Sequence, residues 1–243
     1  MPKKICIIVP CYNEANRLAV DVYLSFLKEN PDMDICFVND GSTDETWRVL
    51  ENMQSLFPDR ILAVNKKPNQ GKAEAVRSGI VQVSEKNTYE WVGFMDADLA
   101  TPLPEVYRLA KVLETEKNVV VVMGSRIKRM GVRVSRKPLR HYMGRIFATV
   151  VGLLFRLNAY DTQCGAKIFT TSVAREIFAR PFHSPWLFDV ELLLRIRQGH
   201  ADYNVVVKEI PLDRWEEKGG SKIRFSHLLK MPFELYTIYR KYR

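Results

Sequence analysis

The sequence contains no apolar run long enough to cross a bilayer. A spanning helix needs ~20 predominantly apolar residues, whereas the longest apolar run, residues 146–155, has ten and is flanked by Arg145 and Arg156. The opening MPKKICIIVP also has too short an apolar run for a secretory signal peptide. These absences argue against an integral membrane protein and against a secreted one.

Cysteine and histidine are scarce, with four of each among 243 residues. The cysteines form no C-x-x-C pair and no zinc-like spacing with the histidines, so no zinc site is indicated. Cys6 and Cys36 lie in apolar runs, where reduced and buried thiols are expected. We therefore expect a reducing compartment, the cytoplasm.

Two common glycine-rich phosphate loops are missing as well. The sequence has no G-x-G-x-x-G, which leaves dinucleotide binding without a motif. Gly71 and Lys72 do not form a Walker A loop, because Lys66 stands at the position of its first glycine and Ala73 at that of its Ser or Thr. No nucleic-acid motif occurs either, and we expect no nucleic-acid partner.

Positive charge is present in excess but is unevenly spread. The net charge is +9, yet residues 126–145 contain eight Lys or Arg and no acid, and residues 218–243 contain seven Lys or Arg and one acid. Two confined basic segments indicate a localised anionic partner, such as a phosphate or a lipid headgroup.

Short β-branched runs alternate with helical patterns in the first half of the chain. Hydrophobic residues make up 47% of the sequence, which is enough for a sizeable core. The pattern predicts strands at 4–10, 34–39, 61–65, 91–95 and 119–124, and helices at 14–28, 43–56 and 71–84. Such alternation is typical of an α/β fold with a mostly parallel sheet and helices on both faces.

The second half is less regular, and no linker or repeat divides the chain. We expect a basic loop at 126–138, helices at 139–157, 187–197 and 225–243, and strands at 167–169 and 203–210. A single domain over residues 1–243 is favoured, with a first half at 1–125, a second at 126–224 and an amphipathic C-terminal helix at 225–243.

Polar residues follow each of the first four predicted strands. They lie at 13–14, 40–42, 70–72 and 96–98. Ligands of open α/β sheets bind at the carboxyl ends of the strands, so we expect these loops to converge on one site.

Asp96 and Asp98 are the candidate metal ligands at this edge of the sheet. Two carboxylates at i and i+2 can approach one divalent cation, which would bridge nucleotide-sugar phosphates and stabilise a departing diphosphate. Two acids at a strand end are more often solvated, but the three companion loops favour a metal site. Asp40 is expected to accept a uracil imide N–H or a ribose hydroxyl from within an Asp-Gly turn. Gly71 and Lys72 are expected to meet a phosphate at a helix N-terminus.

Several motifs in order resemble those of the GT-A-fold family 2 glycosyltransferases. In the first half these are VPCYNE, VNDGSTD, NQGKAEAV and DADLATP. In the second half GSR, DTQCGAKIF, WLFDVELL and W-x4-GSK look like the dolichyl-phosphate glucosyltransferase and mannosyltransferase branch, with spellings closer to the glucosyl members. The resemblance covers residues 5–222.

The resemblance implies roles for particular residues. The nucleotide would be held by Pro10, Tyr12, Glu14 and Asp40, and Mg²⁺ or Mn²⁺ by Asp96 and Asp98. Asn13, Gly41, Gly71 and Lys72 complete the predicted nucleotide-sugar site in the first half. Two departures stand out: Ala100 replaces a Gln found in some mannosyl members, and the N-terminal anchor of many eukaryotic glucosyl members is not seen.

The resemblance also suggests a ligand for the two basic segments, namely the phosphate of the acceptor lipid. Arg126, Arg140 and Lys222 are candidates to hold the phosphate of a polyprenyl or dolichyl phosphate. The helices at 139–157 and 225–243 combine apolar faces with basic ends, which fits interfacial helices and core packing equally well. We expect peripheral attachment to the cytoplasmic face of a membrane through such helices.

The expected reaction is a single in-line displacement with inversion. A phosphate monoester is largely dianionic at neutral pH and needs little help from a base. We expect Asp98, Asp189 and Arg126 to act in catalysis, with Asp189 as a base, a positioning residue or a sugar ligand, and Glu191 as structural. UDP-glucose is the favoured donor, with GDP-mannose and UDP-GlcNAc or another UDP-sugar behind it. The alternatives are a family 2 enzyme acting on a glycan or protein hydroxyl, a nucleotide-sugar-binding protein without turnover, and a nucleic-acid-binding role, which the basic segments allow but no motif accompanies.

Overall fold

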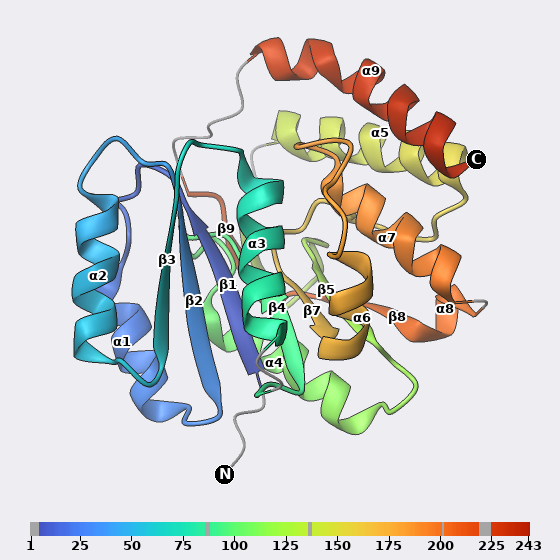
Figure 1. The fold of residues 1–243 in the computed structure, drawn as a ribbon. Coiled ribbons are helices and arrows are strands. Elements are labelled where there is room, and N and C mark those ends of the chain that lie inside the picture. The colour runs from blue at the N-terminus through green and yellow to red at the C-terminus, as the bar shows by residue number, and fades with distance from the viewer. Residues whose placement is uncertain (1–4, 86–87, 136–137, 201, 219–224) are drawn as a thin grey trace.

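A mixed sheet runs through the protein, with helices on both of its faces (Figure 1). The structure is a computed structural model that describes residues 5–85, 88–135, 138–200, 202–218 and 225–243, leaving aside the side chains of 133–135, 138–141 and 225–230. The strands of the main sheet are β1 (Ile5–Cys11), β2 (Met33–Asp40), β3 (Ile61–Lys66), β4 (Trp91–Phe94), β5 (Val121–Ser125), β7 (Lys167–Thr170) and β8 (Val207–Pro211). A separate pair is formed by β6 (Arg133–Ser135) and β9 (Arg214–Glu216).

Helices connect most of these strands. They are α1 (Val20–Glu29), α2 (Thr46–Leu56), α3 (Lys72–Glu85), α4 (Leu103–Thr115), α5 (Pro138–Phe155), α6 (Thr171–Ile177), α7 (Phe188–Gly199), α8 (Tyr203–Val206) and α9 (Phe225–Tyr242). In the described part of the chain, no helix combines the length and hydropathy needed to span a membrane.

The strand order in the main sheet is β3-β2-β1-β4-β7-β5-β8. The first four strands are parallel to one another, and β8 is parallel to β5. β7 runs antiparallel to both of its neighbours, β4 and β5. The predicted α/β fold with a mostly parallel sheet is therefore confirmed, with one reversed strand inside it.

The core has one hydrophobic cluster on each face of the sheet. α1, α2 and α4 pack on one face, whereas α3, α6 and α7 pack on the other. All residues of β2 are buried, as expected of a strand that helices cover on both faces of the sheet. α3 lies so near the sheet that a Cβ at Gly79 would be 2.8 Å from Ile8 Cγ2.

Several predicted elements differ from the observed ones. The helix expected at 14–28 begins only at Val20, because Asn13 has a left-handed backbone and the Glu14 N–H bonds the Thr46 hydroxyl instead of starting a helix. α4 and α6 were not among the expected helices. The strand expected at 203–210 is divided into α8 and β8, and the basic loop contains β6.

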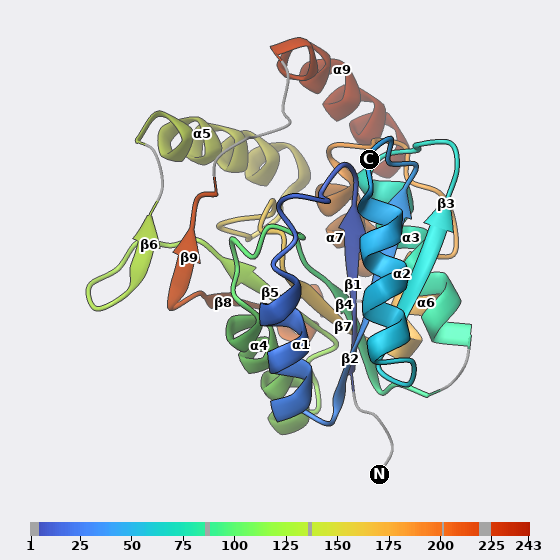
Figure 2. The same cartoon turned by 90° about the vertical axis from the view of Figure 1, so that its left-hand side faces the viewer.

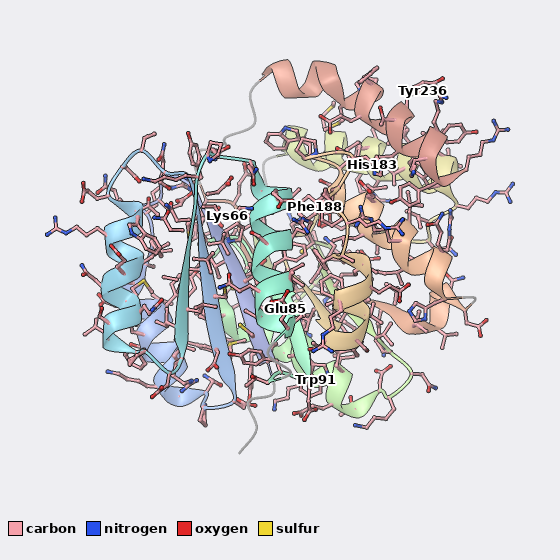
Figure 3. The ribbon with its side chains drawn as sticks, in the orientation of Figure 1. Lys66, Glu85, Trp91, His183, Phe188 and Tyr236 are labelled. Atoms are coloured by element: carbon pink, nitrogen blue, oxygen red, sulfur yellow. The ribbon has the colours of Figure 1, made fainter. Side chains whose placement is uncertain are left out.

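The carboxyl ends of the parallel strands point toward the end of the molecule that α5 and α9 cover. Figures 1 and 2 show β1 running from the N-terminal side toward this end, where α5 and α9 also lie. Figure 3 places Lys66 and Phe188 near this end, and Trp91 and Glu85 near the opposite one. The predicted polar loops thus lie at the same end of the molecule as two helices from the second half of the chain.

Candidate functional site

The loops after β1 and β2 are tied together by hydrogen bonds. The Asn13 N–H donates to Ser42 Oγ at 3.0 Å, and the Thr43 N–H donates to Asn13 Oδ1 at 2.8 Å. Asn13 takes a φ of 51°, a conformation that asparagine tolerates better than most residues. The side chain of Asn13 is therefore used to join two loops of the site.

Asp40 joins the loop after β2 to the N-terminus of α3. Its carboxylate is 3% exposed and accepts from the Gln70 N–H at 2.9 Å, the Gly71 N–H at 2.8 Å and Asn69 Nδ2 at 3.0 Å. Gly41 permits this close approach, since it has a φ of 66° and a Cβ there would be 2.5 Å from Asn69 N. The sequence did not reveal this loop-holding role, and contact of Asp40 with a nucleotide remains a prediction.

The remaining predicted nucleotide residues border the same loops. Pro10 lies near the end of β1 and is half-buried, and the Tyr12 side chain is exposed. Glu14 is buried, with its N–H on Thr46 Oγ1 at 2.8 Å. Gly71 immediately precedes α3, and Lys72 is its first residue. The predicted convergence of the polar loops is therefore observed.

Asp96 and Asp98 follow β4, as expected, and each already has a polar contact. Lys72 Nζ lies 2.5 Å from Asp96 Oδ1, which links the loop after β4 to α3. Asp98 Oδ1 accepts the Ala100 N–H at 3.0 Å. Burial raises the pKa of Asp98 above its ordinary value. Partial burial would lower the pKa of Lys72, whose side chain is 37% exposed, but Asp96 and Asp189 together raise this pKa, so its ammonium group is charged.

The two carboxylates fit a divalent cation that is shared with a phosphate ligand. Gly165 leaves room for Asp96, because a Cβ at this position would overlap its carboxylate. The Lys72 ammonium group already stands as a cation against Asp96. No group of three or more His, Cys, Asp or Glu suited to a metal occurs among the described residues. The chain would thus supply two ligands, as Mg²⁺ sites completed by substrate phosphates and water do.

Asp189 lies at the start of α7 and is paired with a buried lysine. Lys167 Nζ is 2.5 Å from Asp189 Oδ1, and the Lys167 side chain has no solvent exposure. The same ammonium group donates to the Thr162 and Cys164 carbonyl oxygens, at 2.9 and 2.7 Å. Lys167 therefore connects α7 to the loop that carries Gly165. Its importance was not predicted, although the DTQCGAKIF motif contains it.

Arg126 lies near enough to Asp96 to feel its charge, and its guanidinium group is paired with Asp161. Its Nε and Nη2 atoms each lie 2.7 Å from a carboxylate oxygen of Asp161. Burial opposes the charge on Arg126, but the Asp161 carboxylate raises its pKa above the ordinary value. Arg126 and Asp161 line a small cavity of about 40 Å³ together with Arg145 and Gln163. The side chain of Arg140 and the whole of Lys222 lie outside the described residues.

Glu191, expected to be structural, faces away from this region. Its carboxylate is fully buried and accepts from the His183 ring, Arg195 Nη2 and the Tyr242 hydroxyl, each at 2.8 Å. Ser184, in the preceding loop, bonds Glu234 of α9. These contacts attach α9 to α7.

A family model and the similar proteins all point to glycosyltransferases. The family model described as "Glycosyl transferase family 2" matches residues 6–178. A dolichyl-phosphate beta-glucosyltransferase of Trichomonas vaginalis is 32% identical, over 95% of this chain and 69% of its own length. The human enzyme of the same name is 31% identical, over 99% of this chain and 76% of its own.

Solved structures resemble the fold over nearly the whole chain. Glucosyl-3-phosphoglycerate synthase from Mycobacterium tuberculosis, in complex with UDP, has a TM-score of 0.67 and 17% identity, covering 98% of this chain and 80% of its own. A structure of that synthase with Mn²⁺, UDP-glucose and phosphoglyceric acid also has a TM-score of 0.67 and 17% identity, with 97% and 78% covered. At this identity the likeness concerns the fold.

Proposed function

The chain belongs to glycosyl transferase family 2, and from this premise we propose that it transfers glucose from UDP-glucose to a dolichyl or polyprenyl phosphate. The observation that carries the proposal is the extent of the similarity to dolichyl-phosphate beta-glucosyltransferases, which runs through both halves of the chain. The Mn²⁺ and UDP-glucose in structures of the same fold support a metal-assisted reaction with this donor. GDP-mannose is the alternative donor.

The donor is held by the loops after β1 to β4. Pro10, Tyr12 and Glu14 border the nucleotide, and the Asp40 carboxylate fixes the backbone of residues 69–71 around it. Asp96 and Asp98 would hold Mg²⁺ or Mn²⁺, which when bound would supply positive charge next to the departing diphosphate. The N-terminus of α3, with Gly71 and Lys72, faces the same phosphates.

The acceptor phosphate attacks the anomeric carbon in line with the bond to the diphosphate. An oxygen of the phosphate forms the new bond, UDP leaves with the electron pair of the broken bond, and the configuration inverts. The dianionic acceptor has no proton to remove. Arg126, fixed by Asp161, and Arg140 and Lys222 of the basic segments contribute the positive charge that attracts it.

Asp189 acts in this reaction as a positioning residue and not as a base. Its Oδ1 atom is already bonded to the buried Lys167. Asp189→Asn keeps an oxygen for this contact but removes the counter-charge of the buried Lys167 ammonium group, so we expect a loss of stability. In the folded variant kcat/KM should fall less than ~10-fold and its pH profile should keep its shape, whereas loss of a general base costs ~10²–10⁴-fold. A loss in that larger range, with a changed profile, would establish a base.

The membrane surface is approached through α5 and α9. α5 buries Ala148, Val151 and Phe155 on one side and exposes Ile146 and Leu153 on another. α9 exposes Phe233 and Tyr236, the latter on its outer side (Figure 3). Exposed apolar residues beside basic segments are typical of helices that lie in a membrane interface. The buried position of all four cysteine thiols is consistent with a reducing compartment and supports the proposal of the cytoplasmic face.

The experiment is transfer of label from UDP-glucose, and separately from GDP-mannose, into butanol-extractable lipid with polyprenyl phosphate and Mn²⁺. We expect labelling from UDP-glucose, and at least a ~10²-fold lower rate in Asp98→Ala. Asp21→Ala, an exposed position on α1, is the control and should leave the rate unchanged. Nucleotide binding without transfer from either donor would contradict the proposed reaction.

A further inference from the structure

Lys72 has an unusual position for a cation. It is the first residue of α3, where the exposed backbone N–H groups carry the positive end of the helix dipole. Its Nζ also lies 5.9 Å from the ring centres of both Phe94 and Phe188, so its surroundings are partly apolar. An ammonium group at this place needs an anion close by, and the structure supplies Asp96 at 2.5 Å.

Asp96 is also one of the two carboxylates that the proposed function assigns to the metal. Mg²⁺ binds oxygen ligands at ~2.0–2.1 Å. It would therefore compete with the Lys72 ammonium group for the same face of Asp96, and the two positive charges would repel each other at such a short separation. A metal bound to Oδ1, the oxygen atom that Lys72 contacts, would therefore take the place of the ammonium group.

We propose that Lys72 is the resident counter-ion of Asp96, that the metal displaces it, and that the released ammonium group then binds the diphosphate of the donor. The inference rests on the proposed metal and donor site. Lys72 would weaken binding of the metal alone, because the metal must break an ion pair, and would strengthen binding of metal and nucleotide together. The site then takes up the two as a unit.

Lys72 is placed so that its ammonium group needs only a small movement to go from Asp96 to the diphosphate of the donor. Gly71 and Lys72 begin the helix whose N-terminus faces the phosphates in the proposed site. The side chain is 37% exposed, so the ammonium group can turn from Asp96 to a ligand without leaving a buried pocket. The diphosphate replaces the negative charge that Asp96 gives up to the metal.

The test measures Mn²⁺ binding without nucleotide, from the spectrum of free Mn²⁺, and UDP affinity at saturating Mn²⁺. For Lys72→Met we expect Mn²⁺ to bind about 10-fold more tightly and UDP about 10-fold more weakly, since one charged contact is lost in each state. Lys72→Arg keeps the charge and should leave Mn²⁺ binding weak. Asp98→Ala in the Lys72→Met background should abolish the gain.

Lys66→Met is the matched control. Lys66 lies at the end of β3, and its Nζ atom is 3.3 Å from Glu74 Oε1 of α3. Like Lys72, it forms an ion pair near the start of α3, but its partner is Glu74 and not Asp96. We expect neither affinity to change in this variant. If Lys72 had only a structural role, Lys72→Met would weaken the affinities for both Mn²⁺ and UDP. Tighter Mn²⁺ binding together with weaker UDP binding would exclude such a role.

The inference is overturned if Lys72→Met binds Mn²⁺ alone no better than the unsubstituted protein, or if the gain survives Asp98→Ala. The reaction can fail separately. Opposite shifts without glucose transfer would contradict the proposed reaction and keep the exchange, whereas transfer without the shifts would contradict the exchange alone.

Discussion

At the scale of single residues, Gly165 shows how closely the second half of the chain packs against Asp96, one of the two proposed metal ligands. A Cβ there would overlap the Asp96 carboxylate. We expect Gly165→Ala to turn Asp96 away and to lower metal-dependent transfer at least ~10-fold, with little loss of stability because Asp96 is part-exposed and can move. Transfer rates and thermal unfolding measure the two effects.

Gly199→Ala provides the comparison for this substitution. A Cβ at Gly199 would lie 2.9 Å from Glu176 Oε1, another carboxylate, at the far end of α7. Transfer should be unaffected in this variant. Equal loss of activity in both variants would mean that crowding a carboxylate, and not displacement of Asp96, causes the effect.

At the scale of elements, Glu191 fastens α9 to α7. Burial raises the pKa of its carboxyl, but hydrogen bonds from His183 and Arg195 outweigh burial and lower it below the ordinary 4.5. In the unfolded chain the group takes up its proton at higher pH than in the folded protein. Its stabilising contribution is therefore complete above pH 4.5 and is lost as the pH falls through the lower folded value.

We expect Glu191→Gln to reduce the free energy of unfolding by about 3 kcal/mol at pH 7, because Arg195 loses a buried partner. The loss should shrink below pH 4.5, because the unfolded chain takes up a proton there while the folded protein stays ionised until its lower pKa is reached. Urea unfolding at pH 7 and at pH 3.5 measures both. Glu51→Gln, at an exposed position on α2, should change neither value. A loss that does not depend on pH would refute the assigned role.

At the scale of the whole molecule, the exposed apolar residues gather on the two helices that cover the site. Leu153 of α5 is 77% exposed and Phe233 of α9 is 73% exposed. We expect Leu153→Gln with Phe233→Gln to weaken binding to vesicles containing anionic phospholipid at least ~10-fold, since each side chain contributes ~1.5–3 kcal/mol when buried. Cosedimentation measures this binding.

Leu56→Gln serves as the control for this surface. Leu56 is 65% exposed but ends α2, on a different part of the molecule (Figure 1). Vesicle binding should be unchanged in this variant. If all three substitutions weaken binding alike, or none does, the membrane-facing role of α5 and α9 is wrong.

Much of the first half could be predicted from the sequence, because its signals are local. Apolar strands followed directly by polar loops mark the edge that Asp40, Asp96 and Asp98 share. α4 could have been predicted too, since Leu103, Val106 and Leu113 recur at helical spacing and are buried.

Other features depend on partners far along the chain. Nothing in the short run KIFT indicates that Lys167 is fully buried against Asp189, 22 residues later. The carboxylate of Asp40 has many possible partners in the sequence, and only the folded loop 69–71 selects them. The reversed direction of β7 also has no local signal, because strand pairing is decided by tertiary contacts.

β7 also has a consequence for the order in which the protein is made. It lies between β4 and β5, so β5 has no place in the main sheet until residues 167–170 exist. A ribosome that has released only the first 125 residues has therefore delivered β5 without the neighbours to which it bonds. The centre of the sheet therefore closes only after β7 has been made, and β7 joins strands of the first half to β5 and β8.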